Sequence, residues 1–290
     1  MATGSELIVK LPAPQTQPRR LLDVLPRIPG VDGPPRWLNG VTWQPWGCHG
    51  LYVDTAVPCN EQDLDNAPMV CEAFVTQLPF RLADAMSGST LEYTYDEIEA
   101  MLNGRYDVQV SAAFATELLD GVGSGGNSLS AAATEPGGAA FGAPAVPVPF
   151  GFAVLEEEIA RRLDGAVGFI HASPGVLAMA IVGYGLEMVD GAWRTPSGNV
   201  VLSDAGYKNA VQPTNEAASS FGEEWVYASG PVFFESTAPT TLGSGSQTLD
   251  VTRNTITQFI EGFGILVFDD CPVTAVLVSY CNECTSGFVS

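Results

Sequence analysis

The most regular hydrophobic pattern in the chain lies between residues 94 and 121. Apolar side chains recur there every three or four residues, which is the period of an amphipathic helix. They are Tyr95, Ile98, Leu102, Tyr106, Val110, Phe114 and Leu118. Thr94 and Glu97 have the spacing of a capping box, and Gly121 is the residue type that commonly follows a helix end. The pattern predicts one helix of about 40 Å that ends at Asp120.

Shorter patterns follow and alternate between helix and strand. A helix is predicted over residues 152–163, with three glutamates (156–158) near its start and two arginines (161 and 162) near its end, as the helix dipole favours. Residues 167–171 have the pattern of a buried strand, and Ser173-Pro174 predicts the start of an apolar helix that reaches about Leu186. Asp190-Gly191 predicts a turn, and from Trp225 onward the pattern is that of β-strands. This order predicts an α+β fold.

The N-terminal part of the chain is different. Residues 1–40 are rich in proline and show no periodicity, which predicts an extended arm. A free linker has little use for apolar side chains, so we expect the arm to be ordered against another surface. The apolar residues are Leu21, Leu22, Val24, Leu25 and Ile28. Residues 41–90 combine tryptophans and cysteines with many turn residues and predict a turn-rich, extended segment of short strands and loops.

Gly121, Gly123 and Gly126 spell G-x-G-x-x-G, the spacing of a dinucleotide-binding loop. Such a loop must follow a strand and open a helix, because the helix N-terminus binds the pyrophosphate. These glycines follow the end of a predicted helix, where the dipole is negative. We therefore interpret them as a turn and expect no cofactor.

Composition narrows the possible functions. The chain has 290 residues, 46% of them hydrophobic, and a net charge of −21. A nucleic-acid-binding surface needs clustered Lys and Arg, so this balance argues against one. It suits a soluble protein, or one that must not stick to packaged DNA. There is no apolar run of about 18 residues, hence no predicted membrane span. The first residues lack the pattern of a signal peptide, so we expect synthesis in the cytoplasm.

The cysteines form two clusters, one near each end of the chain. In a cytosolic protein, buried thiols are their ordinary use, with a metal site or disulfides formed after release as alternatives. Cys281 and Cys284 make a C-x-x-C pair, although the spacing around Cys59 departs from that of zinc knuckles. The candidate metal ligands are Cys48, His49, Cys59, Cys71, Cys281 and Cys284.

No pattern of nucleophilic catalysis occurs in the sequence. His171 ends a predicted buried strand, and we interpret it as a structural histidine. An acid–base pair among His171, Asp269 and Asp270 is the enzymatic alternative. Glu156, Glu157 and Glu158 could bind a cation, but solvated or helix-capping carboxylates are the more ordinary interpretation. We expect no catalytic residue.

The order of parts resembles that of tailed-phage major capsid proteins with the Hong Kong 97-like fold, which encapsulin shell proteins share. Residues 94–126 (TYDEIEAMLNGRYDVQVSAAFATELLDGVGSGG) are similar to the spine helix of that family and its glycine turn. Residues 169–207 (FIHASPGV…LSDAGY) are similar to its strand, helix and short strand pair. Residues 228–236 and 250–278 (ASGPVFFES and DVTRNTIT…TAVLV) resemble its long strands and last axial strand.

The resemblance implies both a domain organisation and a function. It implies an arm (1–40), an extended segment (41–90), a peripheral domain with the spine helix and long strands (91–139 and 229–269), and an axial domain (140–228 and 270–290). It also implies a structural subunit, not an enzyme, that assembles through hexamers and pentamers into the icosahedral DNA-enclosing shell of a virion. The implied partners are other copies and a portal, scaffold or decoration protein.

Several alternatives stay open at this point. An encapsulin-type compartment is the nearest, followed by another virion protein such as a decoration, connector or tail protein. Some family members cross-link their subunits through a lysine, but this chain has only Lys10 and Lys208. The resemblance therefore implies no catalytic residue in this chain. In a shell, the apolar arm is expected to lie on a neighbouring subunit.

Overall fold

The computed structural model describes residues 20–30, 36–43, 75–123, 128–134, 136, 144–207, 213, 222–242, 249–250, 252–269 and 273–280. These residues fall into two units. The first unit contains Leu82–Val110 and Ala238–Gly262, and the second contains the described parts of Arg19–Arg81, Ser111–Thr237 and Phe263–Ser290. Both helices and strands occur, as the predicted α+β class requires.

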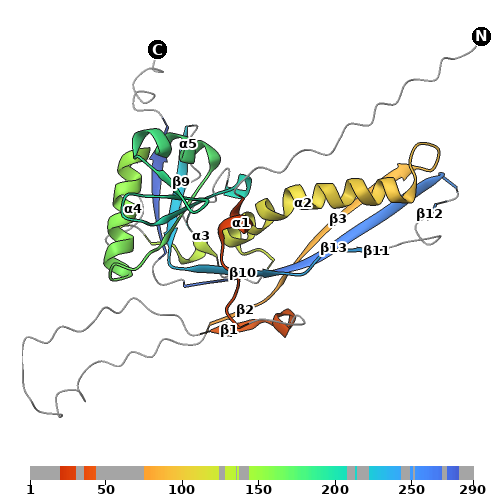
Figure 1. The fold of residues 1–290 in the computed structure, drawn as a ribbon, viewed down its shortest axis with the longest axis horizontal. Coiled ribbons are helices and arrows are strands. Elements are labelled where there is room, and N and C mark those ends of the chain that lie inside the picture. The colour runs from red at the N-terminus through yellow and green to blue at the C-terminus, as the bar shows by residue number, and fades with distance from the viewer. Residues whose placement is uncertain are drawn as a thin grey trace, which may run out of the picture. The chain divides into compact units, whose positions relative to one another are not determined.

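The first unit combines one helix with a strand layer. Strand β13 (Thr255–Phe268) pairs with β3 (Phe80–Ser89), with β11 (Thr240–Leu242) and with β12 (Leu249–Asp250). Helix α2 (Tyr95–Asp120) runs beside β3 and β13 (Figure 1). It packs on them through a cluster made by Leu102, Tyr106 and Ile260. Alternate residues of each strand point to opposite faces, so this cluster covers only one face of the strand layer.

The ends of α2 are as the sequence predicts. The Glu97 backbone N–H donates to Thr94 Oγ1 over 3.3 Å, and the Thr94 N–H donates to the Glu97 carboxylate over 2.9 Å, which is the capping box. After Asp120, Gly121 has a φ of 65° and its N–H donates to the Glu117 carbonyl. Gly121 thus terminates a helix, as expected of a turn and not of a dinucleotide loop; Gly126 lies outside the described residues.

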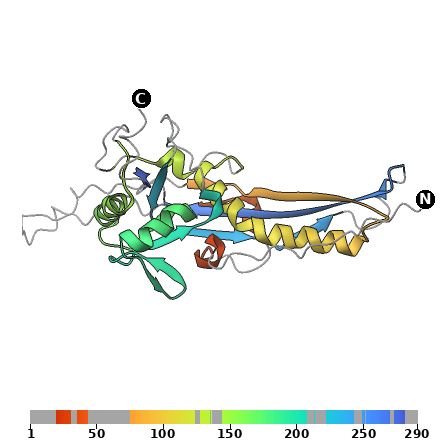
Figure 2. The same cartoon turned by 90° about the horizontal axis from the view of Figure 1, so that it is seen from above.

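The second unit contains a seven-stranded sheet in the order β4-β14-β9-β5-β8-β7-β6. Figure 2 shows the same ribbon from above, with the helices between residues 148 and 183 of this unit in green. Strand β5 is parallel to β8, and β4 is parallel to β14, whereas the remaining pairs are antiparallel. The strands are β4 (Val146–Pro147), β5 (Phe169–Ala172), β6 (Glu187–Val189), β7 (Ala192–Arg194), β8 (Val200–Ser203), β9 (Glu223–Ser229) and β14 (Thr274–Ser279).

Both faces of this sheet are covered. Helices α4 (Val148–Arg162) and α5 (Pro174–Gly183) pack on the face that carries Ile170 and Ala172 of β5. On the opposite face, His171 contacts the short helix η4 (Ala205–Tyr207), and α1 (Leu21–Val24) lies against β8. The short helix α3 (Leu129–Ala132) leads to Thr134, which bridges to Thr274 at the start of β14.

Two predicted helix boundaries in this unit were wrong. Helix α4 begins at Val148, four residues before the predicted start, because Pro149 in its first turn needs no backbone donor there. Helix α5 ends at Gly183 and not near Leu186, since Gly185 follows in the left-handed region with φ of 81°. The predicted turn at Asp190-Gly191 is confirmed by φ values of 51° and 82°.

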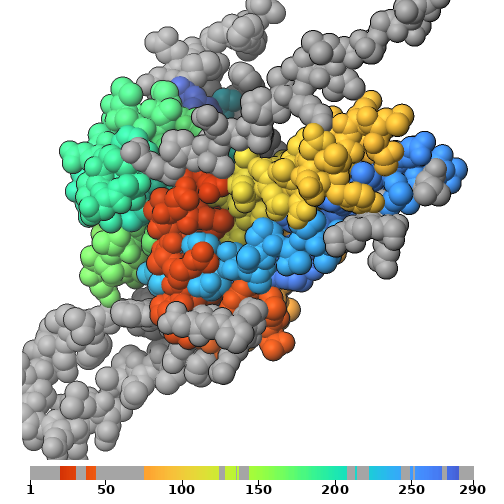
Figure 3. All heavy atoms as spheres, turned by 45° about the vertical axis from the view of Figure 1, so that its right-hand side comes forward, coloured from red at the N-terminus to blue at the C-terminus, as the bar shows by residue number. Residues whose placement is uncertain are grey.

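The apolar part of the N-terminal segment packs on its own chain, which corrects the expectation that it needs a neighbouring subunit. Leu21 is 1% exposed, and its N–H donates to Asp204 over 3.1 Å. The N–H of Ile28 donates to the carbonyl of Phe234 in β10 (Val232–Ser236). Figure 3 shows the described part of this N-terminal segment, in red, packed against other parts of the same chain. Residues 1–19 lie outside the described residues.

Where the structure describes it, the segment before β3 consists mostly of short helices and strands. Helix η1 (Arg36–Asn39) precedes β1 (Val41–Trp43), which pairs with β2 (Val75–Gln77) in a separate two-stranded sheet. Trp37 and Ile28 share an apolar cluster with Ile265 and Val267 of β13. Within the described ranges, no helix is both long and apolar enough to cross a membrane.

Candidate functional site

The candidate metal ligands named from the sequence lie in parts of the chain that the structure does not describe. Residues Cys48, His49, Cys59, Cys71, Cys281 and Cys284 all lie outside the described residues. Among the residues that are described, no three His, Cys, Asp or Glu side chains come together in a way that could hold a metal ion. Buried thiols therefore stay the prediction for the cysteines, with the metal site and disulfides as alternatives.

His171 can be placed, and its surroundings define its role. It is 1% exposed in the middle of the sheet. Its Nδ1 lies 3.0 Å from the Tyr207 hydroxyl and its Nε2 lies 2.8 Å from Ser229 Oγ. Ser229 donates its own proton to the Gly230 carbonyl over 2.9 Å, so it accepts from Nε2–H, and Nδ1 accepts from Tyr207.

This arrangement has no free proton-transfer capacity. Burial lowers the pKa of His171 to about 3, so the imidazole is neutral near neutral pH. Although a serine lies beside a histidine, the hydroxyl proton of Ser229 is directed away from the imidazole, and Ser229 is 0% exposed. His171 is thus a structural histidine, as interpreted from the sequence. Asp269, the second member of the enzymatic alternative, is buried as well, and Asp270 lies outside the described residues.

The three glutamates of α4 differ from the sequence interpretation. Because the helix starts early, they lie beyond its first two turns and do not cap it. Glu157 is exposed, but Glu156 and Glu158 are only 8% and 6% exposed. These two buried carboxylates each form the centre of a polar network, so solvation does not explain them.

The first network joins three elements around Glu156. The Tyr184 hydroxyl donates to one carboxylate oxygen, and the side-chain amide of Asn199 donates to the other over 3.3 Å. The backbone N–H of Ser197 also donates to that second oxygen. Burial, followed by the Glu156 carboxylate, raises the pKa of Tyr184. The network fixes α4 to the end of α5 and to the loop between β7 and β8.

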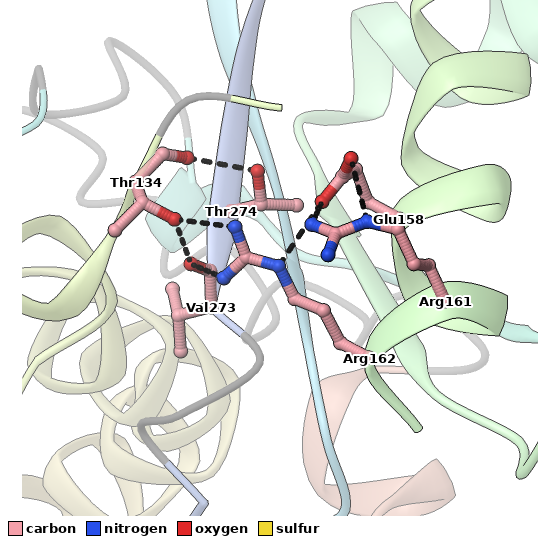
Figure 4. A network of polar contacts seen from close by, with 6 residues as sticks. All are labelled: Thr134, Glu158, Arg161, Arg162, Val273 and Thr274. Carbon is pink, nitrogen blue, oxygen red and sulfur yellow. Dashed lines mark hydrogen bonds and ion pairs between the residues drawn. The ribbon is translucent and has the colours of Figure 1, made fainter. Parts of the chain in front are cut away.

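The second network surrounds Glu158 and is drawn in Figure 4. Arg161 and Arg162 both donate to Glu158 Oε2, over 2.6 and 3.0 Å. The Arg162 guanidinium also reaches Thr134 Oγ1 over 2.7 Å, and the Thr134 carbonyl accepts from Thr274 Oγ1. These contacts connect the end of α4 to the segment after α3 and to the start of β14. No sequence pattern links these three segments, which is why the sequence did not reveal the network.

A third polar contact anchors the start of α5. Ser173 Oγ accepts from the Val176 N–H over 3.3 Å, as an N-cap does. The same hydroxyl donates to Glu224 of β9 and lies 3.3 Å from the Tyr280 hydroxyl. The cap predicted at Ser173-Pro174 is confirmed. The polar clusters described so far hold elements of the second unit together and are internal to it.

The surface of the second unit offers a different kind of feature. Large apolar side chains are exposed on α5 and at the start of α4, where Val182 is 87%, Phe150 60% and Met179 46% exposed. Exposed apolar patches mark protein–protein or membrane interaction sites or ligand-binding grooves. This apolar surface is the candidate site that the structure provides.

Comparison with known proteins gives the fold a context. No protein-family model matches the chain, and no curated protein matches its sequence. A chain from Gordonia phage Cozz is similar in structure, with a TM-score of 0.53, 10% sequence identity, and coverage of 96% of this chain and 91% of that chain. A chain from a structure described as the capsid of a native GTA particle has a TM-score of 0.53 and 12% identity, covering 96% of this chain and 95% of that chain.

The protein has a capsid-type fold. The likeness extends over nearly the whole length of both chains. A chain of the holo-SrpI encapsulin complex from Synechococcus elongatus PCC 7942 has a TM-score of 0.48 at 12% identity, covering 94% of this chain and 92% of that chain.

Proposed function

We propose that the protein is a structural subunit whose copies assemble into the closed icosahedral shell that encloses the DNA of a tailed phage. The observation that carries the proposal is the capsid-type fold, which matches a capsid chain over 96% of this sequence. The buried networks around Glu156 and Glu158 and the neutral, fully bonded His171 support a structural role. They brace the α/β unit and offer no reactive group.

In this proposal each part of the chain has a place in the shell. Helix α2 is the spine of a peripheral domain made by residues 91–139 and 229–269. The seven-stranded sheet with α4 and α5 belongs to an axial domain made by residues 140–228 and 270–290. Residues 1–40 and 41–90 are the arm and the extended segment. Other copies form hexamers and pentamers, and portal, scaffold or decoration proteins are further partners.

The charge of the chain suits a DNA-filled shell. With 12 basic residues against 33 acidic ones, the wall does not hold DNA by phosphate contacts, which require clustered Lys and Arg. A weakly adhering wall leaves the enclosed DNA free to be packed and released. The shell accordingly encloses the DNA without sequence-specific binding.

Negative-stain electron microscopy of the purified protein tests the proposal. The protein is expressed alone and together with its neighbouring genes, and closed polyhedral shells are expected in at least one preparation. Nuclease-protected DNA inside shells from phage-producing cells supports a capsid, whereas an enclosed protein cargo without DNA indicates an encapsulin-type compartment. Rings, tubes or surface knobs indicate a connector, tail or decoration protein. Monomers or dimers under both conditions contradict the proposal.

A further inference from the structure

Helix α5 has an unusual composition for a surface helix. Its ten residues, PGVLAMAIVG, contain no polar side chain. A helix that is apolar all round is normally buried on every side, but α5 is buried on one side only. Val176 and Ala180 are 0% exposed and pack on the sheet, whereas Met179 and Val182 are 46% and 87% exposed. The outward side of α5 therefore keeps an apolar surface in contact with water.

The start of α4 lies beside the end of α5. Gly183 at the end of α5 lies so near the Pro149 ring that an added Cβ would stand 2.8 Å from Pro149 Cγ. The Phe152 and Tyr184 rings lie 5.7 Å apart at the same crossing. Phe150, next to Pro149, is 60% exposed. We call Phe150, Ala178, Met179 and Val182 together the α5 face; Figure 1 shows α4 and α5 side by side in the second unit.

The charge distribution indicates what can cover this face. Residues 165–186, which include all of α5, contain no Asp, Glu, Lys or Arg, although the chain as a whole carries a net charge of −21. Two copies of so acidic a chain repel each other wherever their charged surfaces meet. They can approach most readily where the surface is uncharged, and apolar side chains gain free energy when such a contact removes water. A basic partner would instead favour an acidic surface.

We infer that the α5 face is a contact between copies of this chain. This inference rests on the proposed function and deepens it, because it names the surface by which one subunit meets the next. In a shell the contact is heterologous, so the α5 face of one copy meets a different surface of its neighbour, and the repeated contact closes. The face is then solvent-exposed only in the free subunit.

Charged substitutions at Val182 test the inference. Val182→Asp and Val182→Lys both place a charge on the α5 face, and the lysine has the sign that a helix C-terminus favours. We expect both variants to keep the wild-type unfolding temperature, because the side chain lies in water. We expect both to lose shell assembly, or to need at least about a tenfold higher protein concentration for it, which corresponds to one buried aliphatic side chain.

Val122 provides a matched control, since it is also a valine and is 85% exposed, in the turn after α2. Val122→Asp and Val122→Lys introduce the same charges away from the α5 face and are expected to assemble like the wild type. Met179→Lys repeats the test at a second position in case the Val182 variants fail to fold. Light scattering against protein concentration and negative-stain images are the readouts.

The outcomes separate the inference from the function on which it rests. Shells from the wild type and the Val122 variants, but not from the Val182 and Met179 variants, support the inference. If folded Val182 and Met179 variants form shells at the wild-type threshold, the inference is overturned while the proposed function stands, and the face belongs to another partner. Equal loss in the Val122 variants also overturns it, since added charge anywhere would then suffice. A wild type that never forms shells overturns the proposed function itself.

Discussion

The two units of the chain differ in how completely they cover the faces of their strand layers. The second unit covers both faces of its sheet, with α4 and α5 on one face and η4 and α1 on the other. In the first unit α2 covers one face of the strand layer, and the opposite face carries Leu242 and Phe259, which are paired across β11 and β13 and are 43% and 47% exposed. The second unit thus contains the larger core, and we expect stability to be concentrated there.

The polar contacts of the two units also differ, in how deeply they are buried. The second unit buries Glu156, Glu158 and His171 with full sets of partners. In the first unit, the main ion pair joins Asp84 to Arg105 over 2.5 Å, with side chains that are 27% and 40% exposed. Buried polar networks specify one arrangement of their elements, whereas exposed pairs contribute little. The α/β unit is therefore the more rigidly defined of the two.

Removing a phenylalanine from each unit is the strongest way to break this comparison. Phe152→Ala empties a site that is 0% exposed in α4, and we expect a loss of about 3–5 kcal/mol in the free energy of unfolding. Phe259→Ala removes a half-exposed ring from the first unit and is expected to cost less than about 1 kcal/mol. Denaturant unfolding of the unassembled protein measures both values. Equal losses would contradict the expectation that stability is concentrated in the second unit.

Neutralising one carboxylate in each unit gives the next largest effect. Glu158→Gln removes the carboxylate charge that pairs with the nearly buried Arg162, which is 11% exposed, and we expect a cost of about 2–4 kcal/mol. Asp84→Asn breaks the more exposed pair with Arg105 and is expected to cost less than about 1 kcal/mol. Raising the salt concentration should weaken the Asp84 contribution more than that of Glu158. If Asp84→Asn cost as much as Glu158→Gln and its cost did not depend on salt, the two ion pairs would not differ as expected.

The two units also differ in the pH range over which they lose stability. His171 has a pKa lowered by burial to about 3, from 6.5, so the unfolded chain binds its proton first and stability falls as pH drops below 6.5. At pH 5 this amounts to about 2 kcal/mol. The hydrogen bonds from Arg105 lower the pKa of Asp84 below 3.8, so its stabilisation is lost only at more acidic pH.

A single variant isolates the contribution of His171. Between pH 7 and 5, His171→Gln is expected to flatten the decline in the free energy of unfolding, because the titrating group is gone. Unfolding by denaturant at several pH values is the measurement. A decline that survives in His171→Gln would mean that other groups cause it.

The smallest expected difference in stability is between the N-caps of α2 and α5. Thr94→Ala removes an exposed cap from α2 and is expected to cost about 0.5–1 kcal/mol. Ser173→Ala removes a cap that also bonds Glu224 in a buried setting, so we expect about 1–2 kcal/mol. Serine at position 94 serves as a conservative control and is expected to restore the cap. Thermal unfolding resolves these differences, and equal costs would argue against the burial effect.

Local signals explain what the sequence could predict. The ends of α2 depend on Thr94, Glu97 and Gly121, all within or beside the helix, and these were predicted correctly. The role of Glu156 depends on Tyr184 and Asn199, which are far away in sequence, so local patterns could not show that it is buried.

The N-terminal segment likewise shows which features local sequence patterns can predict and which they cannot. Its apolar residues correctly indicated that it is ordered against a surface. Only the structure showed that the surface of Leu21 and Ile28 belongs to the same chain. The apolar composition of α5 could be read from the sequence, but its half-exposed position could not, because exposure depends on how the helix packs.

The central claim is that copies of this chain form the wall of a closed shell. The most direct test is a cryo-electron-microscopy reconstruction of particles purified from cells that express the chain with its neighbouring genes. We predict a closed icosahedral wall whose density fits this fold at every position, with α5 facing the adjacent copy. A wall built from another protein, with this chain confined to a portal, tail or surface knob, would contradict the claim.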